Sequence, residues 1–217
     1  MRDIRECSVS VVGGAGFLGS HLVDHLIEDR NCKVLVIDNL VAGRREFVHK
    51  DATFVHHDIT GSESRLRDLF EQHNVRYVLN YSAEPYIPIS FARPIHVCDV
   101  NFMGAMRVIN AAQEAGIDGI LQVSSAEIYG GGEYQYKGIG DEPKITESTT
   151  VNPHSSYGAA KAAVDNWVQV RWREAKTPCI ALRQFNVYGP RETHSYVIPE
   201  IIGQIHQNGP TVKLGNN

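Results

Sequence analysis

The sequence has 217 residues, of which 42% are hydrophobic and 21% are charged, and its formal net charge is −4 at pH 7. This composition is that of a globular protein with one sizeable core, and the lack of a basic run argues against nucleic acid as a partner. No apolar run is long enough for a membrane helix, and the charged start MRDIRECS does not fit a signal peptide. We therefore expect one cytoplasmic domain over residues 1–217 and no membrane partner.

Short β-rich apolar runs alternate along the chain with longer stretches of helical periodicity. The expected strands are residues 8–12, 33–37, 53–57, 77–81, 119–124 and 178–185. The expected helices are residues 17–28, 63–73, 94–115, 157–175 and 197–207. The longer loops are residues 38–52, 82–93 and 126–154. The alternation predicts an α/β fold, a Rossmann-like doubly wound parallel sheet with helices on both faces, whose ligands bind at the carboxyl ends of the strands.

The first expected strand runs directly into a helix through a turn that contains Gly13, Gly16 and Gly19. In a dinucleotide site, the first glycine permits the tight turn, the second lets backbone approach a pyrophosphate, and the third lets the helix pack on the strand. Asp38 ends the second strand about 20 residues later, where a carboxylate accepts hydrogen bonds from the adenosine ribose. A turn that merely needed glycine is the alternative, but this context favours a dinucleotide.

Asp38 also bears on the choice of dinucleotide, because a carboxylate there repels the 2′-phosphate of NADP. We therefore expect NAD. Arg44 and Arg45 follow shortly and could offset that repulsion by folding back. Asp58, after the third strand, is placed to meet the adenine amino group, although a capping or turn aspartate fits the position equally well.

The stretch SSYGAAK places Tyr157 and Lys161 four residues apart, on one face of an expected helix. A phenol has an ordinary pKa near 10, and bringing it near 7 takes roughly 4 kcal/mol of preferential stabilisation of the phenolate. A nearby ammonium and the positive ring of an oxidised nicotinamide can supply much of that. A chance Tyr-x-x-x-Lys is the alternative, and the serine hydroxyls at the end of LQVSSAEIYG favour the catalytic interpretation.

In combination, GGAGFLG, VLVIDN, SSAEIYG, SSYGAAK and LRQFNVYGPR resemble the extended short-chain dehydrogenase/reductase superfamily, in its NAD-dependent nucleotide-sugar epimerase/dehydratase branch. The resemblance implies that Ser125 is the catalytic serine, that Tyr157 is the base, and that Lys161 holds the ribose and lowers the tyrosine pKa. The cofactor contacts that it implies are Gly13, Gly16, Phe17, Leu18, Gly19, Asp38, Asn39, Asp58, Ile59, Ser82, Ala83, Asn101, Ser124, Tyr157, Lys161 and Val187. The implied substrate contacts are Glu84, Tyr86, Ser125, Asn186 and Arg191.

The implied reaction is a transient oxidation at C4 of a nucleotide-diphosphate hexose. Tyr157 would take the hydroxyl proton while hydride moves to NAD, and Ser125 would hydrogen bond the same oxygen. Branch members that lose water or carbon dioxide resemble Thr-Asp-Glu or Thr-Ser-Glu, whereas this chain has Ser125, Ala126 and Glu127. The missing acid favours a UDP-sugar 4-epimerase. A dehydratase or decarboxylase with Glu127 as its base is the alternative, and Glu127 as an ordinary loop carboxylate is a third interpretation.

Members of this branch continue beyond the stretch that matches VKLGNN into a smaller domain that closes over the nucleotide. We expect that substrate-binding part to begin near residue 186 and to be largely missing. A homodimer is expected, because branch members commonly dimerise through the helix that carries Trp167 and Trp172. A catalytically idle NAD-binding module is the alternative from another class. No metal site is expected, since His21 and His25 lack a third ligand and the four cysteines form no CxxC pair.

Overall fold

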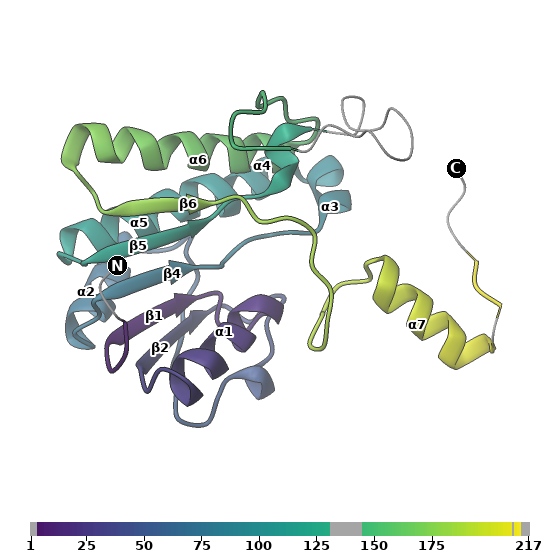
Figure 1. Cartoon of the computed structure of the whole chain (residues 1–217), viewed down its shortest axis with the longest axis horizontal. Helices are drawn as coiled ribbons and strands as arrows, with labels where there is room; N and C mark the ends of the chain where they lie inside the picture. The colour runs from purple at the N-terminus through teal and green to yellow at the C-terminus, as the bar shows by residue number, and fades with distance from the viewer. Residues whose placement is uncertain (1–3, 131–144, 210, 214–217) are drawn as a thin grey trace.

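The computed structural model describes residues 4–130, 145–209 and 211–213, and in this part the strands form one parallel six-stranded sheet (Figure 1). Across the sheet the strands run in the order β3-β2-β1-β4-β5-β6. The strands are β1 (Ser8–Val12), β2 (Lys33–Asp38), β3 (Thr53–His56), β4 (Tyr77–Asn80), β5 (Gly119–Val123) and β6 (Cys179–Leu182). The predicted Rossmann-like doubly wound sheet is confirmed.

Helices cover both faces of the sheet, and apolar side chains meet them in two layers. On one face, Val9 and Val11 of β1 pack with Leu26 of helix α1 (Phe17–Glu28). On the other face, α2 (Glu63–Gln72), α5 (Ala105–Glu114) and α6 (Ser156–Ala175) pack on residues such as Val12 and Val78. Because β1 is buried on both sides, it has the continuous apolar character of a central parallel strand.

Several segments differ from the sequence-based expectation. The expected helix over residues 94–115 is divided into α4 (Pro94–Cys98), a π-helical turn η2 (Asp99–Gly104) and α5. The expected loop over residues 82–93 contains helix α3 (Ile87–Ala92), which a proline in its first turn favours. The expected loop over residues 38–52 contains a 3₁₀ turn, η1 (Arg45–Phe47). Residues 131–144 of the expected loop 126–154 lie outside the described residues, and the loop begins with a 3₁₀ turn, η3 (Ala126–Tyr129).

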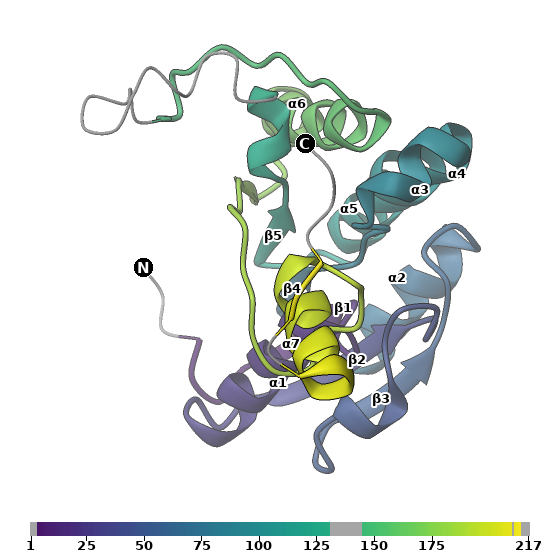
Figure 2. The ribbon, with the colours of Figure 1, turned by 90° about the vertical axis from the view of Figure 1, so that its right-hand side faces the viewer.

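The last strand is shorter than expected, because its neighbour in the sheet, β5, ends at Val123 opposite Leu182. On this edge strand, Ile180 and Leu182 point to the α1 side and remain 64% and 40% exposed. Helix α7 (Val197–Asn208) stands beyond the carboxyl ends of the strands, away from the sheet (Figures 1 and 2). The segment between β6 and α7, residues 183–196, therefore crosses the sheet edge where ligands bind in such folds.

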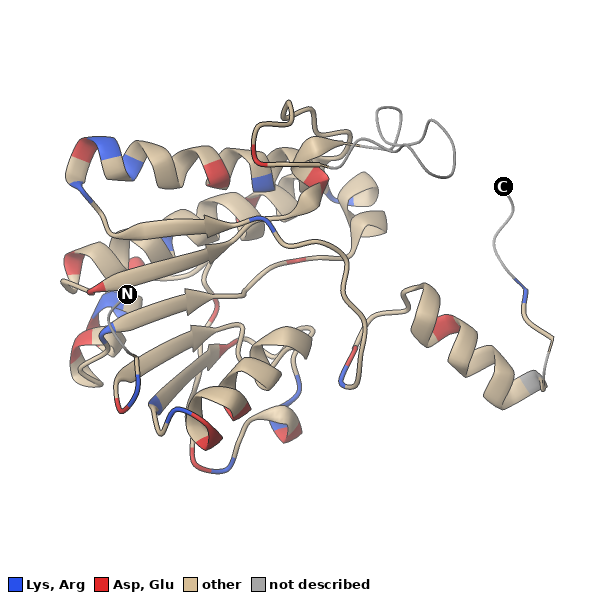
Figure 3. Ribbon diagram, in the orientation of Figure 1, with Lys and Arg blue, Asp and Glu red and all other residues tan. Residues whose placement is uncertain are grey.

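Lysine and arginine residues are interspersed with aspartate and glutamate residues over the helices and loops, without a basic run (Figure 3). Within the described ranges, no helix is long and apolar enough to cross a membrane. Of the two tryptophans on α6, Trp167 packs against the core, whereas Trp172 is 53% exposed.

Candidate active site

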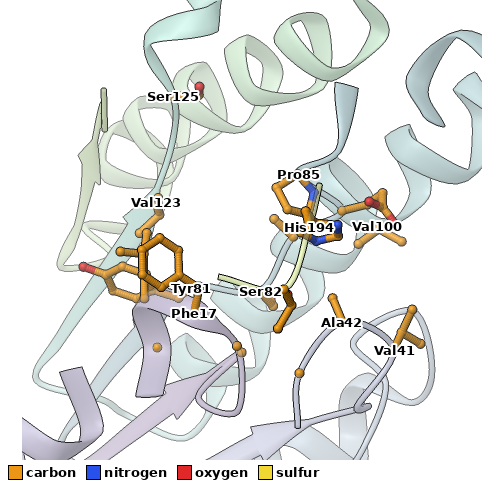
Figure 4. A pocket seen from close by; sticks show the side chains of 18 of the residues that line it. Phe17, Val41, Ala42, Tyr81, Ser82, Pro85, Val100, Val123, Ser125 and His194 are labelled. Carbon is orange, nitrogen blue, oxygen red and sulfur yellow. The ribbon is translucent and has the colours of Figure 1, made fainter. Parts of the chain in front are cut away.

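A cleft with a cavity volume of about 640 Å³ lies at the carboxyl ends of β1 and β4 (Figure 4). It forms where the strand order reverses, since the chain passes from β1 to β2 on one side and returns to β4 on the other. In open α/β sheets this switch point is where ligands bind. The cleft therefore lies where the sequence places the site.

The glycine turn after β1 forms the floor of the cleft. Gly13 has φ +81°, and a β-carbon there would lie 2.6 Å from the backbone nitrogen of Ser82, so only glycine fits. Gly16 is the N-cap of α1, and among the described residues no side chain caps this helix end. The first amide groups of the helix, at Phe17 and Leu18, adjoin the cleft without an intrahelical partner. Such an uncapped N-terminus fits the pyrophosphate of a dinucleotide.

Asp38 is buried beside this turn and is held by two backbone amides. Its Oδ2 accepts a hydrogen bond from the Ala15 amide at 3.0 Å, and its Oδ1 accepts one from the Leu40 amide at 2.8 Å. The carboxylate lines the cleft, where its remaining lone pairs can accept bonds from ribose hydroxyls.

The two arginines that could have offset the charge of Asp38 point elsewhere. Arg44 Nη1 lies 3.5 Å from Glu46 Oε1, and the Arg45 guanidinium lies 4.7 Å from the centroid of the Phe54 ring. Because neither side chain turns toward Asp38, this end of the cleft fits NAD better than NADP.

Asp58 fits both interpretations of its position, as a residue of the binding cleft and as a turn aspartate. It lines the cleft, and it also accepts hydrogen bonds from the Thr60 amide and hydroxyl at 2.8 and 2.7 Å, as a turn aspartate does. The Asn39 amide donates to its second oxygen at 2.8 Å. The carboxylate is therefore held in one orientation at the edge of the cleft.

The three residues of the predicted catalytic set converge from two elements. Ser155 caps α6 by accepting a hydrogen bond from the Gly158 amide at 3.0 Å, which places Tyr157 in the first turn of the helix. The Ser125 side chain, two residues after the end of β5, lies within hydrogen-bonding reach of the buried Tyr157 phenol. The Lys161 ammonium lies 5.8 Å from the Tyr157 ring centroid and donates to the Val123 carbonyl at 3.1 Å.

Burial sets the protonation of this cluster. It raises the pKa of Tyr157; the hydrogen bond from Ser125 acts in the opposite direction, and the negative charge of Glu127 raises the pKa further. The expected lowering of the tyrosine pKa is therefore not present in the arrangement of these side chains. Burial also lowers the pKa of Lys161 to about 8. The phenol thus needs a cation close to its oxygen before it can ionise near neutral pH.

Most of the other predicted site residues also line the cleft. They are Gly13, Gly19, Asn39, Ile59, Ser82, Ala83, Glu84, Ser124, Glu127, Asn186 and Val187. Three do not. Asn101 is buried behind the wall, where its side chain accepts from the Glu84 amide at 3.0 Å and donates to the Glu84 carbonyl at 2.9 Å. Tyr86 stacks on His194 with ring centroids 5.6 Å apart, and Arg191 forms an ion pair with Asp24 of α1 at 2.7 Å.

Buried polar residues behind the cleft were missed by the sequence reasoning. Asn80 accepts hydrogen bonds from the Ser82 hydroxyl at 2.5 Å and the Ser82 amide at 3.1 Å, and donates to Gln122 at 2.7 Å. These bonds fix the start of the segment that follows β4. Amide side chains in two otherwise apolar strands were the signal that could have found them.

Sequence comparison places these features in a family. Residues 9–217 match the model of the NAD dependent epimerase/dehydratase family. The chain belongs to this family. NAD is the cofactor of this epimerase/dehydratase family, whose members are enzymes, and the uncapped helix end and Asp38 fit such a dinucleotide.

Relatives in the epimerase/dehydratase family include both kinds of enzyme. The chain is 32% identical over 212 residues to dTDP-D-glucose 4,6-dehydratase of Mus musculus, covering 92% of this chain and 56% of the relative. It is 32% identical over 184 residues to UDP-glucose 4-epimerase of Streptococcus mutans, covering 85% and 53%. The chain thus spans about half the length of the curated relatives it matches. The structure of DesIV, a dTDP-glucose 4,6-dehydratase from Streptomyces venezuelae with NAD and TYD bound, matches with a TM-score of 0.82 at 26% identity, covering 92% and 62%.

Proposed function

We propose that this chain carries out the C4 oxidation and reduction of a nucleotide-sugar 4-epimerase, with NAD as cofactor and a UDP-sugar as substrate. The convergence of Ser125, Tyr157 and Lys161 at the cleft is the observation that carries the proposal. A hydroxyl donor, a phenol and a buried amine in one place have no evident structural purpose together. They are the set that a reversible alcohol oxidation requires.

Each side chain has a defined task in this reaction. Ser125 hydrogen bonds the sugar oxygen at C4 and orients it toward Tyr157. Tyr157 takes the proton from that oxygen as the C4 carbon is oxidised, and returns it when the carbon is reduced. Lys161, one turn along α6, holds the cofactor ribose, and its ammonium together with the positive ring of oxidised NAD would supply the cation that the phenol needs to ionise. Bound NAD supplies the reversible acceptor for the C4 hydride.

A second candidate function follows from Glu127. This carboxylate lines the cleft, and its charge reaches the Tyr157 phenol. A base in this position supports loss of water or carbon dioxide from the oxidised sugar. The neighbouring Ala126 provides no acid for a departing hydroxyl, so this feature favours epimerisation over 4,6-dehydration.

The test begins with the cofactor. Purified protein is denatured, and released dinucleotide is identified by chromatography; NAD is the expected species. Native protein supplied with NAD is then incubated with UDP-, dTDP- and GDP-hexoses and with UDP-glucuronate, whose carboxylate is the one group that could leave as carbon dioxide, and the products are resolved by chromatography and mass. Epimers of a UDP-sugar are expected. Loss of water or carbon dioxide would support the role of Glu127 as base instead.

A variant separates catalysis from an idle NAD-binding module. Tyr157→Phe removes the phenolic oxygen and leaves the helix and the glycine turn intact. We expect NAD to stay bound while turnover falls at least about a hundredfold. Unchanged turnover would remove Tyr157 as the base, and bound NAD with no product from any sugar in wild type would favour the idle module.

We also propose that two copies of the chain associate through α6. The half-exposed Trp172 on the outer side of this helix supports such an interface, because aromatic side chains are enriched at interface centres. Sedimentation of wild type and Trp172→Glu tests it. A dimer that dissociates in the variant is expected, whereas a monomeric wild type would contradict the proposal.

A further inference from the structure

Three aromatic rings form an aromatic wall on one side of the cleft: His194 and Tyr196 line the cleft, and Tyr86 packs against them without lining it. Tyr86 follows β4, whereas His194 and Tyr196 belong to the segment between β6 and α7. The Tyr86 and His194 rings are stacked at an interplanar angle of 7°, and the Tyr196 ring meets them edge-on at 5.9 and 5.7 Å. The Tyr196 hydroxyl donates to the Pro85 carbonyl at 2.9 Å. Figure 4 shows His194 beside Pro85, on the side of the cleft away from Phe17.

Two carboxylates, those of Glu84 and Glu192, flank this aromatic wall and line the cleft with His194 and Tyr196. Glu84 precedes Tyr86, and its position is fixed because the buried Asn101 side chain binds both of its backbone groups. Its carboxylate accepts one bond, from the Tyr86 amide at 3.3 Å. Glu192 lies on the opposite segment. Glu84, Glu192, Tyr157 and Tyr196 all line the cleft, and the pKa of Tyr196 is raised by burial and further by these neighbouring acidic groups.

Among the described residues that line the cleft, no arginine neutralises the carboxylates of Glu84 and Glu192. Of the described residues that line the cleft, Lys161 is the one lysine or arginine, and its ammonium already donates to the Val123 carbonyl. Arg191, which the sequence places near this wall, pairs with Asp24 outside it. With Glu127 beside Tyr157, the catalytic end of the cleft therefore carries three carboxylates that have no arginine partner among the residues described there.

We propose that Glu84, Glu127 and Glu192 select sugars without a negative charge, so that neutral hexoses are used in preference to uronates. The inference rests on the proposed function and names the substrate class of that site. Partly desolvated like charges repel strongly, whereas the aromatic wall offers apolar surface to the C–H groups of a neutral ring. Because these glutamates line the same cleft as Tyr157, a carboxylate at C6 would add a further negative charge there when C4 lies at Tyr157.

UDP-glucose and UDP-glucuronate test the proposal, because they share the same diphosphate and differ only at C6. Repulsion on the diphosphate therefore cancels in the ratio of their kcat/KM values. With the NAD-loaded wild-type protein we expect UDP-glucose to be preferred at least about tenfold, and its dissociation constant to be lower in the same direction. Both substrates are offered together, and all products are resolved by chromatography.

The double variant Glu84→Gln/Glu192→Gln removes two charges and keeps the shape of the wall. We expect the preference to fall at least about threefold in this variant, or in Glu192→Gln alone if the double variant does not fold. The matched control is Glu71→Gln, which removes a carboxylate from the exposed side of α2. It should leave the ratio as in wild type.

The outcomes separate the two proposals. If the wild type uses UDP-glucuronate as well as UDP-glucose, or if the glutamine variants keep the full preference, charge selection is overturned while the nucleotide-sugar function stands. If neither sugar gives product with NAD bound, the proposed function fails, and the two dissociation constants decide the charge selection. Equal dissociation constants would overturn it, whereas tighter binding of UDP-glucose would support it.

Discussion

The backbone carbonyl oxygen of Glu127 lies 2.7 Å from the point that a β-carbon on Gly158 would occupy. The first turn of α6 therefore packs directly on the 3₁₀ turn η3 with no side chain between them. This contact brings Tyr157 to Ser125, because Tyr157 lies in that first turn of α6 and Ser125 is the N-cap of η3. The glycine after the tyrosine in SSYGAAK is thus explained by packing as well as by helix formation.

Gly158→Ala is expected to destabilise the protein and to displace the phenol. The added methyl group meets backbone, which cannot rotate away, so we expect the free energy of unfolding to fall by about 1–3 kcal/mol. Turnover should fall as well, because Tyr157 moves relative to Ser125. Urea unfolding and the epimerase assay measure the two effects.

The control for this substitution is Gly203→Ala in α7, where a new β-carbon meets no atom within 4 Å. Alanine there should be neutral or stabilise by up to about 1 kcal/mol through helix propensity. Equal stability of the two variants would show that the α6 contact with Glu127 is not tight.

The buried Lys161 should make stability rise with pH. Burial lowers its pKa from the ordinary value of 10.5 to about 8, so between these values the unfolded chain binds more protons than the folded protein. The cost of burying the charge is fully present below pH 8 and is relieved above it. Relative to Lys161→Met, we expect the wild type to gain about 1 kcal/mol of unfolding free energy between pH 7.5 and 9.

The pH window keeps this measurement clear of another buried group. Burial raises the pKa of the Cys179 thiol from 9.0 to about 12, which has the opposite sign, because the unfolded chain then loses its proton first. Stability is lost from this source above pH 9, and both proteins contain Cys179, so it cancels in the difference. Lys50→Met, which removes an exposed amine, should follow the wild type at every pH. A constant difference between wild type and Lys161→Met would contradict the prediction.

The parts of the site that follow from local sequence could be predicted, and the parts that depend on the path of an irregular segment could not. Gly13 and Asp38 sit at the ends of apolar strands, so their place at the sheet edge follows from strand topology alone. Tyr157 and Lys161 lie on one helix, where spacing determines their common face. The ion pair of Arg191 with Asp24 has no such signal, because it depends on how residues 183–196 cross the sheet.

Helix boundaries can likewise be predicted where local sequence determines them, but not where a distant contact does. The apolar pattern of residues 94–115 predicts one helix, but the π-helical turn η2 interrupts it at the point where Asn101 turns inward to bind Glu84. The hydrogen-bond partner of Asn101 at this interruption, Glu84, lies 17 residues away in the sequence. The spacing of apolar residues carries no information about such a partner. The raised pKa of Tyr157 likewise depends on burial and on Glu127, neither of which can be read from the spacing of Tyr157 and Lys161.

Arg183 should act as a positioning residue for helix α6, which carries Tyr157. Its Nε and Nη2 donate to the two carboxylate oxygens of Asp165 on α6, each at 2.9 Å, and its Nη1 donates to the Tyr129 hydroxyl at 2.8 Å. These bonds join the segment after β6, the helix that carries Tyr157 and the 3₁₀ turn beside Ser125. Arg183→Lys retains the charge but loses the paired geometry, so we expect a loss of roughly 2–3 kcal/mol of stability.

A double-mutant cycle distinguishes positioning from general stability. Asp165→Asn alone should destabilise about as much as Arg183→Lys, and the double variant should lose less than the sum, because both changes remove one interaction. If the pair aligns Tyr157, kcat falls in both single variants at temperatures where they are fully folded, whereas KM changes little. Arg76→Lys, at an ion pair with Asp118 that is more exposed, is the matched control and should change neither stability nor kcat appreciably. Additive losses in the cycle, or an unchanged kcat in folded Arg183→Lys, would show that α6 holds its position without this pair.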